Sequence, residues 1–178
     1  MQGLVNFASQ LGLAFAVLLQ PVCYVGACIL FLNAGWGFWR QAQPDNPHRG
    51  RPWVPLLSLV VCGILASFPT FLTKANVSAG STVVVRMSDL VSYTPTAPTA
   101  TLLGANPGDT IVNTIELFRQ FFQAFGAMAC LVAVLAWHAS MTGRSNRSRA
   151  ACGVQFAFGI ALINILTISR WLVATLTV

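Results

Sequence analysis

Four long segments of this sequence contain at most one Asp, Glu, Lys or Arg each, and this pattern limits the fold more than any other feature. The segments are residues 21–39, 53–73, 117–138 and 151–176. Only 8% of the 178 residues are charged, whereas a soluble domain has about 25%. A helix needs about 20 mostly apolar residues to cross a bilayer. The sequence therefore predicts an all-α membrane protein with four transmembrane helices.

The stretch before the first span is also apolar, although it carries Asn6, Ser9 and Gln10. Residues 4–39 are too long for one upright span, and Pro21 removes a backbone hydrogen-bond donor. We predict a break at Pro21 and an N-terminal lead-in helix over residues 3–19, interfacial or steeply tilted. One long tilted helix with a kink is the alternative.

Two short loops carry most of the basic residues, against a single acid: Arg40, Arg49, Arg51, Arg144, Arg147 and Arg149. The long middle segment, residues 74–116, has Lys74 and Arg86 against three acids. Short loops rich in arginine stay in the cytoplasm. We predict that both short loops are cytoplasmic, and that the middle loop and both termini are extracytoplasmic. The basic loops are expected to contact anionic lipid, cytoplasmic partners or, at most indirectly, nucleic acid.

The two halves of the chain share a pattern. The stretches "QPVCYVGACI" at 20–29 and "QFFQAFGAMA" at 120–129 both start on Gln and place Gly-Ala seventh and eighth. Each leads into an apolar span, a Trp, a basic loop and a second span. We interpret this as an internal repeat of two tandem αα-hairpins, residues 1–73 and 117–178. The Thr/Pro-rich loop 74–116 separates them; within it "STVVVRM" predicts a short strand and "TPTAPTA" an extended segment.

Small residues recur at helical spacing in three spans, where they allow close helix packing within the chain or between subunits. They are Ser58, Cys62 and Ala66 in the second span, Gly126 and Cys130 in the third, and Gly153, Ala157 and Ala161 in the fourth. Asn33 and Asn164 are each expected to form an interhelical hydrogen bond.

Residues able to carry chemistry are scarce. Glu116, Arg119 and Arg170 are predicted to lie near the extracytoplasmic interface, with a structural ion pair from Glu116 to Arg170; a pore-lining or proton-relay role is the alternative. The two histidines are too far apart in sequence to suggest a haem or metal site. The five cysteines lie in apolar segments, which argues against disulfide-forming membrane oxidoreductases. We predict no catalytic residue, no metal and no cofactor beyond a bound phospholipid.

The second half is the more distinctive. In "RQFFQAFGAMACLVAVLAWHASMTGRSNRSRAACGVQFAFGIALINILTISRWL", an apolar helix with an early glycine precedes a short polar turn and a second helix with a Gly-Ile cluster closing on Ile-Asn, residues 159–164. This resembles the small membrane proteins of type IVB secretion and conjugation systems, of the Dot/Icm and IncI-plasmid type. Where that family has a second glycine before the basic turn, this chain has Ala136 and Trp137. The resemblance implies a structural component of a DNA- or effector-transfer machine, and no catalytic residues.

Together these features predict a non-enzymatic subunit in a bacterial inner membrane. It would pack into a secretion or conjugation apparatus as a homo- or hetero-oligomer, with membrane lipid and other subunits as its partners. One alternative is a pilus or filament subunit at the cell surface, whose basic loops face a lumen or lipid. The other is a small membrane channel or transporter.

Overall fold

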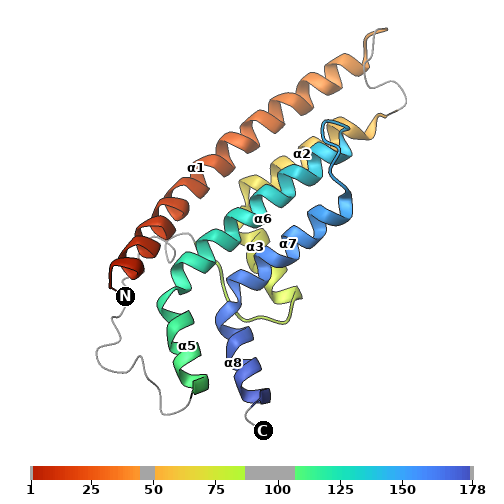
Figure 1. Cartoon of the computed structure of the whole chain (residues 1–178). Helices are drawn as coiled ribbons and strands as arrows, with labels where there is room; N and C mark the ends of the chain where they lie inside the picture. Colours follow the sequence, from red (N-terminus) through yellow and green to blue (C-terminus); the bar gives the residue numbers. More distant parts are fainter. Residues whose placement is uncertain (1, 45–50, 87–106, 177–178) are drawn as a thin grey trace.

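The computed structural model describes residues 2–44, 51–86 and 107–176, and its regular structure there is entirely helical (Figure 1). The helices are α1 (Gln2–Gln41), α2 (Trp53–Ala66), α3 (Phe68–Ser78), α5 (Pro107–Leu117), α6 (Arg119–Met141), α7 (Arg149–Ile163) and α8 (Ile165–Leu176). Residues 81–86 form no strand, contrary to the sequence prediction. Met87 and the "TPTAPTA" stretch lie outside the described residues.

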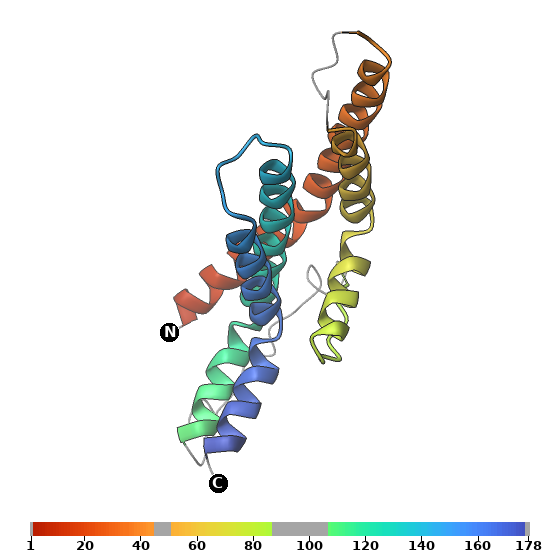
Figure 2. The same cartoon turned by 90° about the vertical axis from the view of Figure 1, so that its right-hand side faces the viewer.

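Two antiparallel helix pairs make up the body of the molecule. α1 packs against α2, α6 packs against α7, and α1 also packs along α6, which joins the two pairs. The turns that follow α1 and α6 lie at the same end of the molecule (Figures 1 and 2). At that end a Cβ built on Gly143 would lie 3.7 Å from the guanidinium of Arg51. We call this end, with its two turns, the basic end.

The helices identify a membrane protein with two to four candidate spans. Val5–Gln41 and Arg119–Met141 are each long and apolar enough to cross a bilayer. The pairs α2 with α3 and α7 with α8 also qualify if each bent pair counts as one span.

α1 runs without interruption from Gln2 to Gln41, so the predicted break at Pro21 and the separate lead-in helix are wrong. Its buried residues recur every three or four positions on both sides of the proline: Ala16, Leu19, Cys23, Ala27, Leu30 and Ala34. Proline removes one helix hydrogen bond, but packing along the whole stripe keeps the two halves aligned. Membrane helices tolerate proline where neighbouring helices hold them in place.

The predicted second and fourth spans are instead broken. α2 and α3 meet at 88°, and α7 and α8 meet at 76°. Pro69, in the first turn of α3, accounts for the first break, because its ring cannot continue the preceding helix. Residues 74–78, in α3, and 107–116, in α5, are helical, although the sequence placed them in the middle loop.

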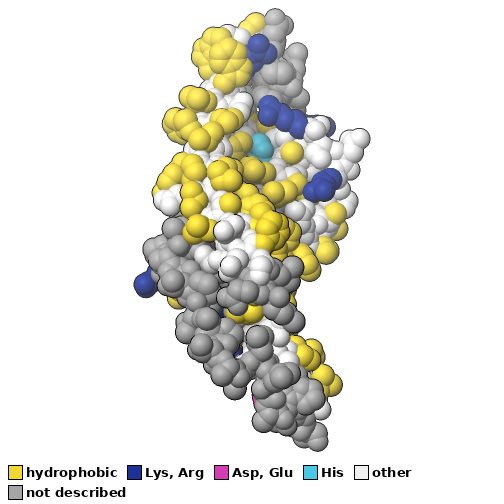
Figure 3. All heavy atoms as spheres, turned by 60° about the vertical axis from the view of Figure 1, so that its left-hand side comes forward, with side chains coloured by type: hydrophobic (Ala, Val, Ile, Leu, Met, Phe, Trp, Pro, Cys, Tyr) yellow, Lys and Arg dark blue, Asp and Glu magenta, His cyan; other side chains and the backbone are white. Residues whose placement is uncertain are grey.

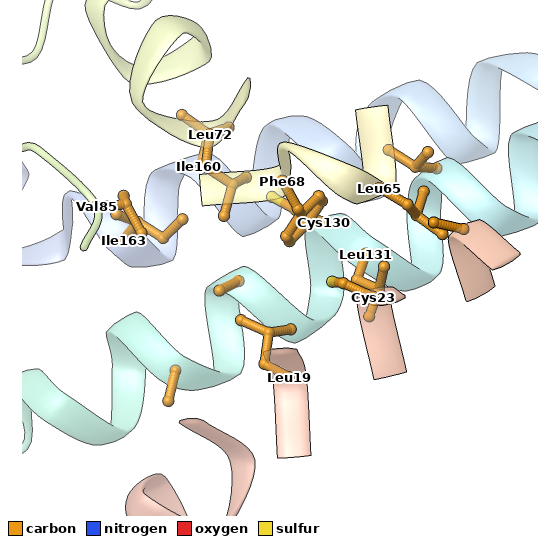
Figure 4. Packing of buried hydrophobic residues seen from close by; sticks show 14 of the residues in the cluster. Leu19, Cys23, Leu65, Phe68, Leu72, Val85, Cys130, Leu131, Ile160 and Ile163 are labelled. Carbon is orange, nitrogen blue, oxygen red and sulfur yellow. The ribbon is translucent and has the colours of Figure 1, made fainter. Parts of the chain in front are cut away.

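The core lies where the two helix pairs meet α3 (Figure 4). Side chains from five helices point toward one another there: Leu19, Cys23, Leu65, Phe68, Leu72, Cys130, Leu131, Ile160 and Ile163. The backbones of α6 and α7 come closest at Gly126 and Gly159. A Cβ on Gly126 would lie 2.7 Å from the carbonyl oxygen of Gly159.

Replacing Gly159 by Ala tests this close approach. The new Cβ would lie 2.5 Å from Cys130 Sγ and 2.8 Å from the Gly126 carbonyl oxygen. We expect Gly159→Ala to lower the free energy of unfolding by about 1–3 kcal/mol, the usual effect of overpacking. The measurement is denaturation in mixed micelles, followed by circular dichroism.

Gly153→Ala on the same helix is the matched control, because nothing lies within 4 Å of a Cβ there. It should keep or slightly raise stability, since Ala forms helix better than Gly by about 0.5–1 kcal/mol. Equal stability of the two variants would contradict the packing described.

Candidate functional site

The basic end carries positive charge that no described acid balances. Arg49 lies outside the described residues; the other predicted arginines are there, namely Arg40, Arg51, Arg144, Arg147 and Arg149. Figure 3 shows basic side chains gathered at this end. The acids of the described chain, Asp109 and Glu116, both belong to α5, at the other end. The basic end therefore attracts anions.

Aromatic side chains lie beside these arginines. The guanidinium of Arg40 lies 5.6 Å from the centre of the Trp36 ring, and Trp36 and Trp39 pack with their ring centres 5.0 Å apart. Both tryptophans and Trp53 are exposed. Exposed tryptophans next to arginines are typical of the boundary between a membrane and water.

Ser58 and His138 form a buried polar pair between α2 and α6. Ser58 Oγ lies 2.9 Å from His138 Nε2 and also donates to the Val54 carbonyl oxygen at 3.2 Å. Beside the pair is a cavity of about 80 Å³ that Asn33 and Arg144 also line. The sequence analysis placed Ser58 in a packing stripe and His138 at a span end, and it did not predict their contact. The signal for the contact was that each hairpin has a polar residue close to its basic loop. The pair links α2 to α6.

A second polar cluster lies at the break between α7 and α8. The Asn164 amide donates to the Asn76 side-chain oxygen at 3.1 Å and to the Ile160 carbonyl at 2.9 Å. Its own oxygen accepts a hydrogen bond from the Ser81 hydroxyl. The Asn164 backbone N–H donates to the same carbonyl at 3.2 Å, so Asn164 caps the end of α7 with both its backbone and its side chain. The predicted interhelical bond of Asn164 is confirmed. Among the described residues, the Asn33 amide donates to Ile29 of its own helix and forms no interhelical bond.

The predicted ion pair between Glu116 and Arg170 is present. Arg170 Nη2 lies 3.5 Å from Glu116 Oε2 and joins α5 to α8. Arg119 forms no salt bridge with any residue that the structure describes. Both partners are well exposed, and such pairs contribute about 0–1 kcal/mol at a water-exposed surface.

The predicted small-residue stripes divide between the interior and the surface. Ser58 is buried, Cys62 half-buried and Ala66 exposed. Gly126 and Cys130 are buried against Gly159. Gly153 and Ala157 are exposed and Ala161 is half-buried. The third-span pair therefore packs within the chain, and most of the fourth-span stripe lies at the surface.

Two grooves follow the exposed side of α7. The one nearer the basic end, which we call the upper groove, measures about 360 Å³ and is lined by apolar side chains and one charged residue: Ile64, Phe71, Val134, Trp137, Phe156 and Arg149. The lower groove measures about 600 Å³ and runs from Phe156 past Asn164 to Ile168. Phe156 lines both grooves, and its ring centre lies 5.8 Å from that of Phe71. Within the described chain no three His, Cys, Asp or Glu residues come together as a metal site.

Comparison with known proteins gave no match to a family model, to a curated protein or to a solved structure. The functional argument therefore rests on the chain's own residues.

The asparagine cluster yields a test of how the broken helices are held. We expect Asn164→Ala and Asn76→Ala each to lower the free energy of unfolding by about 1–3 kcal/mol, because each leaves a buried amide without its partner. The double variant should lose less than the sum, with a coupling of about 0.6–1.7 kcal/mol. Unfolding in mixed micelles gives all the values.

The control is Asn33→Ala, since the exposed Asn33 side chain donates to Ile29 of its own helix and, in the part of the chain that is described, to no other helix. It should change stability by less than about 0.5 kcal/mol. Strict additivity of the two core variants would show that the asparagines do not depend on each other.

Proposed function

We propose that this protein is a non-enzymatic membrane subunit that packs into a multi-subunit transfer complex of a bacterial inner membrane. The resemblance of its second half to type IVB proteins points to a secretion or conjugation apparatus. Its partners would be other subunits, in a homo- or hetero-oligomer, and membrane lipid.

The apolar length of α1 is the observation that carries this proposal. The candidate span Val5–Gln41 contains 37 residues, which is about 55 Å of helix. The hydrocarbon core of a bilayer is about 30 Å thick. The helix would have to tilt by about 55–60° from the bilayer normal to lie entirely within the hydrocarbon core. Membrane helices tilt by roughly 0–40°.

The surface of α1 that faces away from the bundle is apolar along most of this length. Exposed residues include Phe7, Leu18, Val25, Leu32 and Trp39. An apolar surface that the bilayer does not cover is stabilised by contact with another protein. A neighbouring subunit is the cover that this proposal supplies.

The proposal includes an orientation. The turns after α1 and α6 would face the cytoplasm, since their arginines would be retained there. α3, α5 and α8 would lie toward the other side of the membrane. In this orientation the basic end meets anionic lipid or cytoplasmic subunits.

The test is the assembly state of the tagged full-length chain after gentle solubilisation of native membranes. Electron microscopy and mass spectrometry of the particles give their size and composition. We expect discs or rings that hold several copies of the chain, or the chain with other membrane proteins. The sheared surface fraction of the same cells should contain none of it.

Two outcomes would contradict the proposal. Long filaments of this chain alone in the sheared fraction would make it a pilus subunit, with the arginines facing a lumen or lipid. A lone monomer in the solubilised fraction would favour the channel or transporter alternative.

A further inference from the structure

The upper groove lies between the two helix pairs and opens to the surface. α2 and α3 form one wall, α7 forms the other, and α6 forms the floor. Ile64, Phe71, Val134 and Phe156 make it apolar along its length. Because α6 is a candidate span, this surface faces the interior of the membrane.

One end of the upper groove is cationic. Arg149, the first residue of α7, is its charged lining residue and forms no salt bridge within the described chain. Ser148 caps one N–H of the first turn of α7, that of Ala151. The other backbone N–H groups at this helix start add partial positive charge. The cationic end lies beside Trp137, at the basic end of the molecule.

The charge at one end of the groove, together with its size, favours one of two occupants. A helix is about 10 Å wide, so it displaces roughly 800 Å³ for each 10 Å of its length. The upper groove holds about 360 Å³, less than half of this, so a helix of a second copy would insert only the side chains of one face. A flexible hydrocarbon chain fits a narrow apolar groove of this volume.

We propose that the upper groove binds one anionic phospholipid. Its phosphate lies at Arg149 and the start of α7, and an acyl chain follows the groove toward Phe71 and Phe156. The charge at one end and the apolar walls beyond it match the two parts of this ligand. This site rests on the membrane location of α6 and α7 and does not depend on the secretion assembly.

The experiment titrates the detergent-solubilised full-length chain with phosphatidylglycerol and, separately, with zwitterionic phosphatidylcholine, and follows binding by native mass spectrometry. We expect one phosphatidylglycerol to be retained per chain, about five-fold more tightly than phosphatidylcholine. A factor of about five is what one basic residue contributes at an anionic membrane surface.

Two variants, each with a control, separate the contribution of the headgroup to binding from that of the acyl chain. Arg149→Gln should lower phosphatidylglycerol binding about five-fold, to the level of phosphatidylcholine, whereas Arg51→Gln, an exposed arginine outside the groove, should not. Gly153→Leu should abolish retention of both lipids, because Gly153 lines the groove and nothing lies within 4 Å of a Cβ there. Gly63→Leu on α2 is its control, since it is equally open and lies outside the groove.

Helix content of every variant is checked by circular dichroism. Because Arg149 is exposed, Arg149→Gln decides the question even where Gly153→Leu does not fold. An unchanged preference in Arg149→Gln, or an equal loss in Arg51→Gln, would overturn the proposal in favour of diffuse surface charge. A dimer that Gly153→Leu dissociates would assign the groove to a second copy instead.

Discussion

Asn76 and Asn164 meet through a hydrogen bond of 3.1 Å in an interior that is otherwise mostly apolar. An amide left unpaired there would destabilise the fold by about 1–3 kcal/mol. Asn76 belongs to α3, and it reaches Asn164 from a helix that has turned 88° away from α2 at the Pro69 break. The two bends therefore support each other, since Asn164, the residue that caps α7, also bonds Asn76 of α3. α2 and α3, on the two sides of this bend, form one wall of the upper groove.

The bends also make the helices unequal in length. α2 and α7 have 14 and 15 residues, or about 21–23 Å of helix, less than a bilayer core of about 30 Å. They need α3 and α8 to complete a crossing, whereas α1 exceeds the core by a wide margin. A bundle with such unequal helices leaves apolar surface on α1 that its own helices do not bury. This surplus is the physical basis for treating the chain as one part of a larger assembly.

The low content of charged residues and the length of the apolar segments predicted the helical membrane class, because a helix of that length without charges is suited to cross a bilayer. The contact between Glu116 and Arg170 was predictable from their expected place at the same interface. The interhelical bond of Asn164 was predictable because a polar group in an apolar span needs a partner. The breaks between α2 and α3 and between α7 and α8 were not predictable from the sequence. Pro21 lies within a continuous helix and Pro69 next to a break, and their difference depends on the packed stripe around Pro21. The pairing of Ser58 with His138 was missed because it depends on how the two hairpins align. The polar residue close to each basic loop was a signal, but it did not specify a contact.

The central claim is that another protein covers the outer face of α1. Site-specific photo-crosslinking in intact cells tests it most directly, with the probe placed at Phe7 or Trp39, which lie near the two ends of the apolar span and are both more than half exposed. The account predicts a crosslinked protein band from each position, to a second copy or to another subunit, which is absent when membranes are denatured before irradiation. Crosslinks to lipid alone at both positions would contradict it, because the bilayer would then cover the apolar face of α1 by itself.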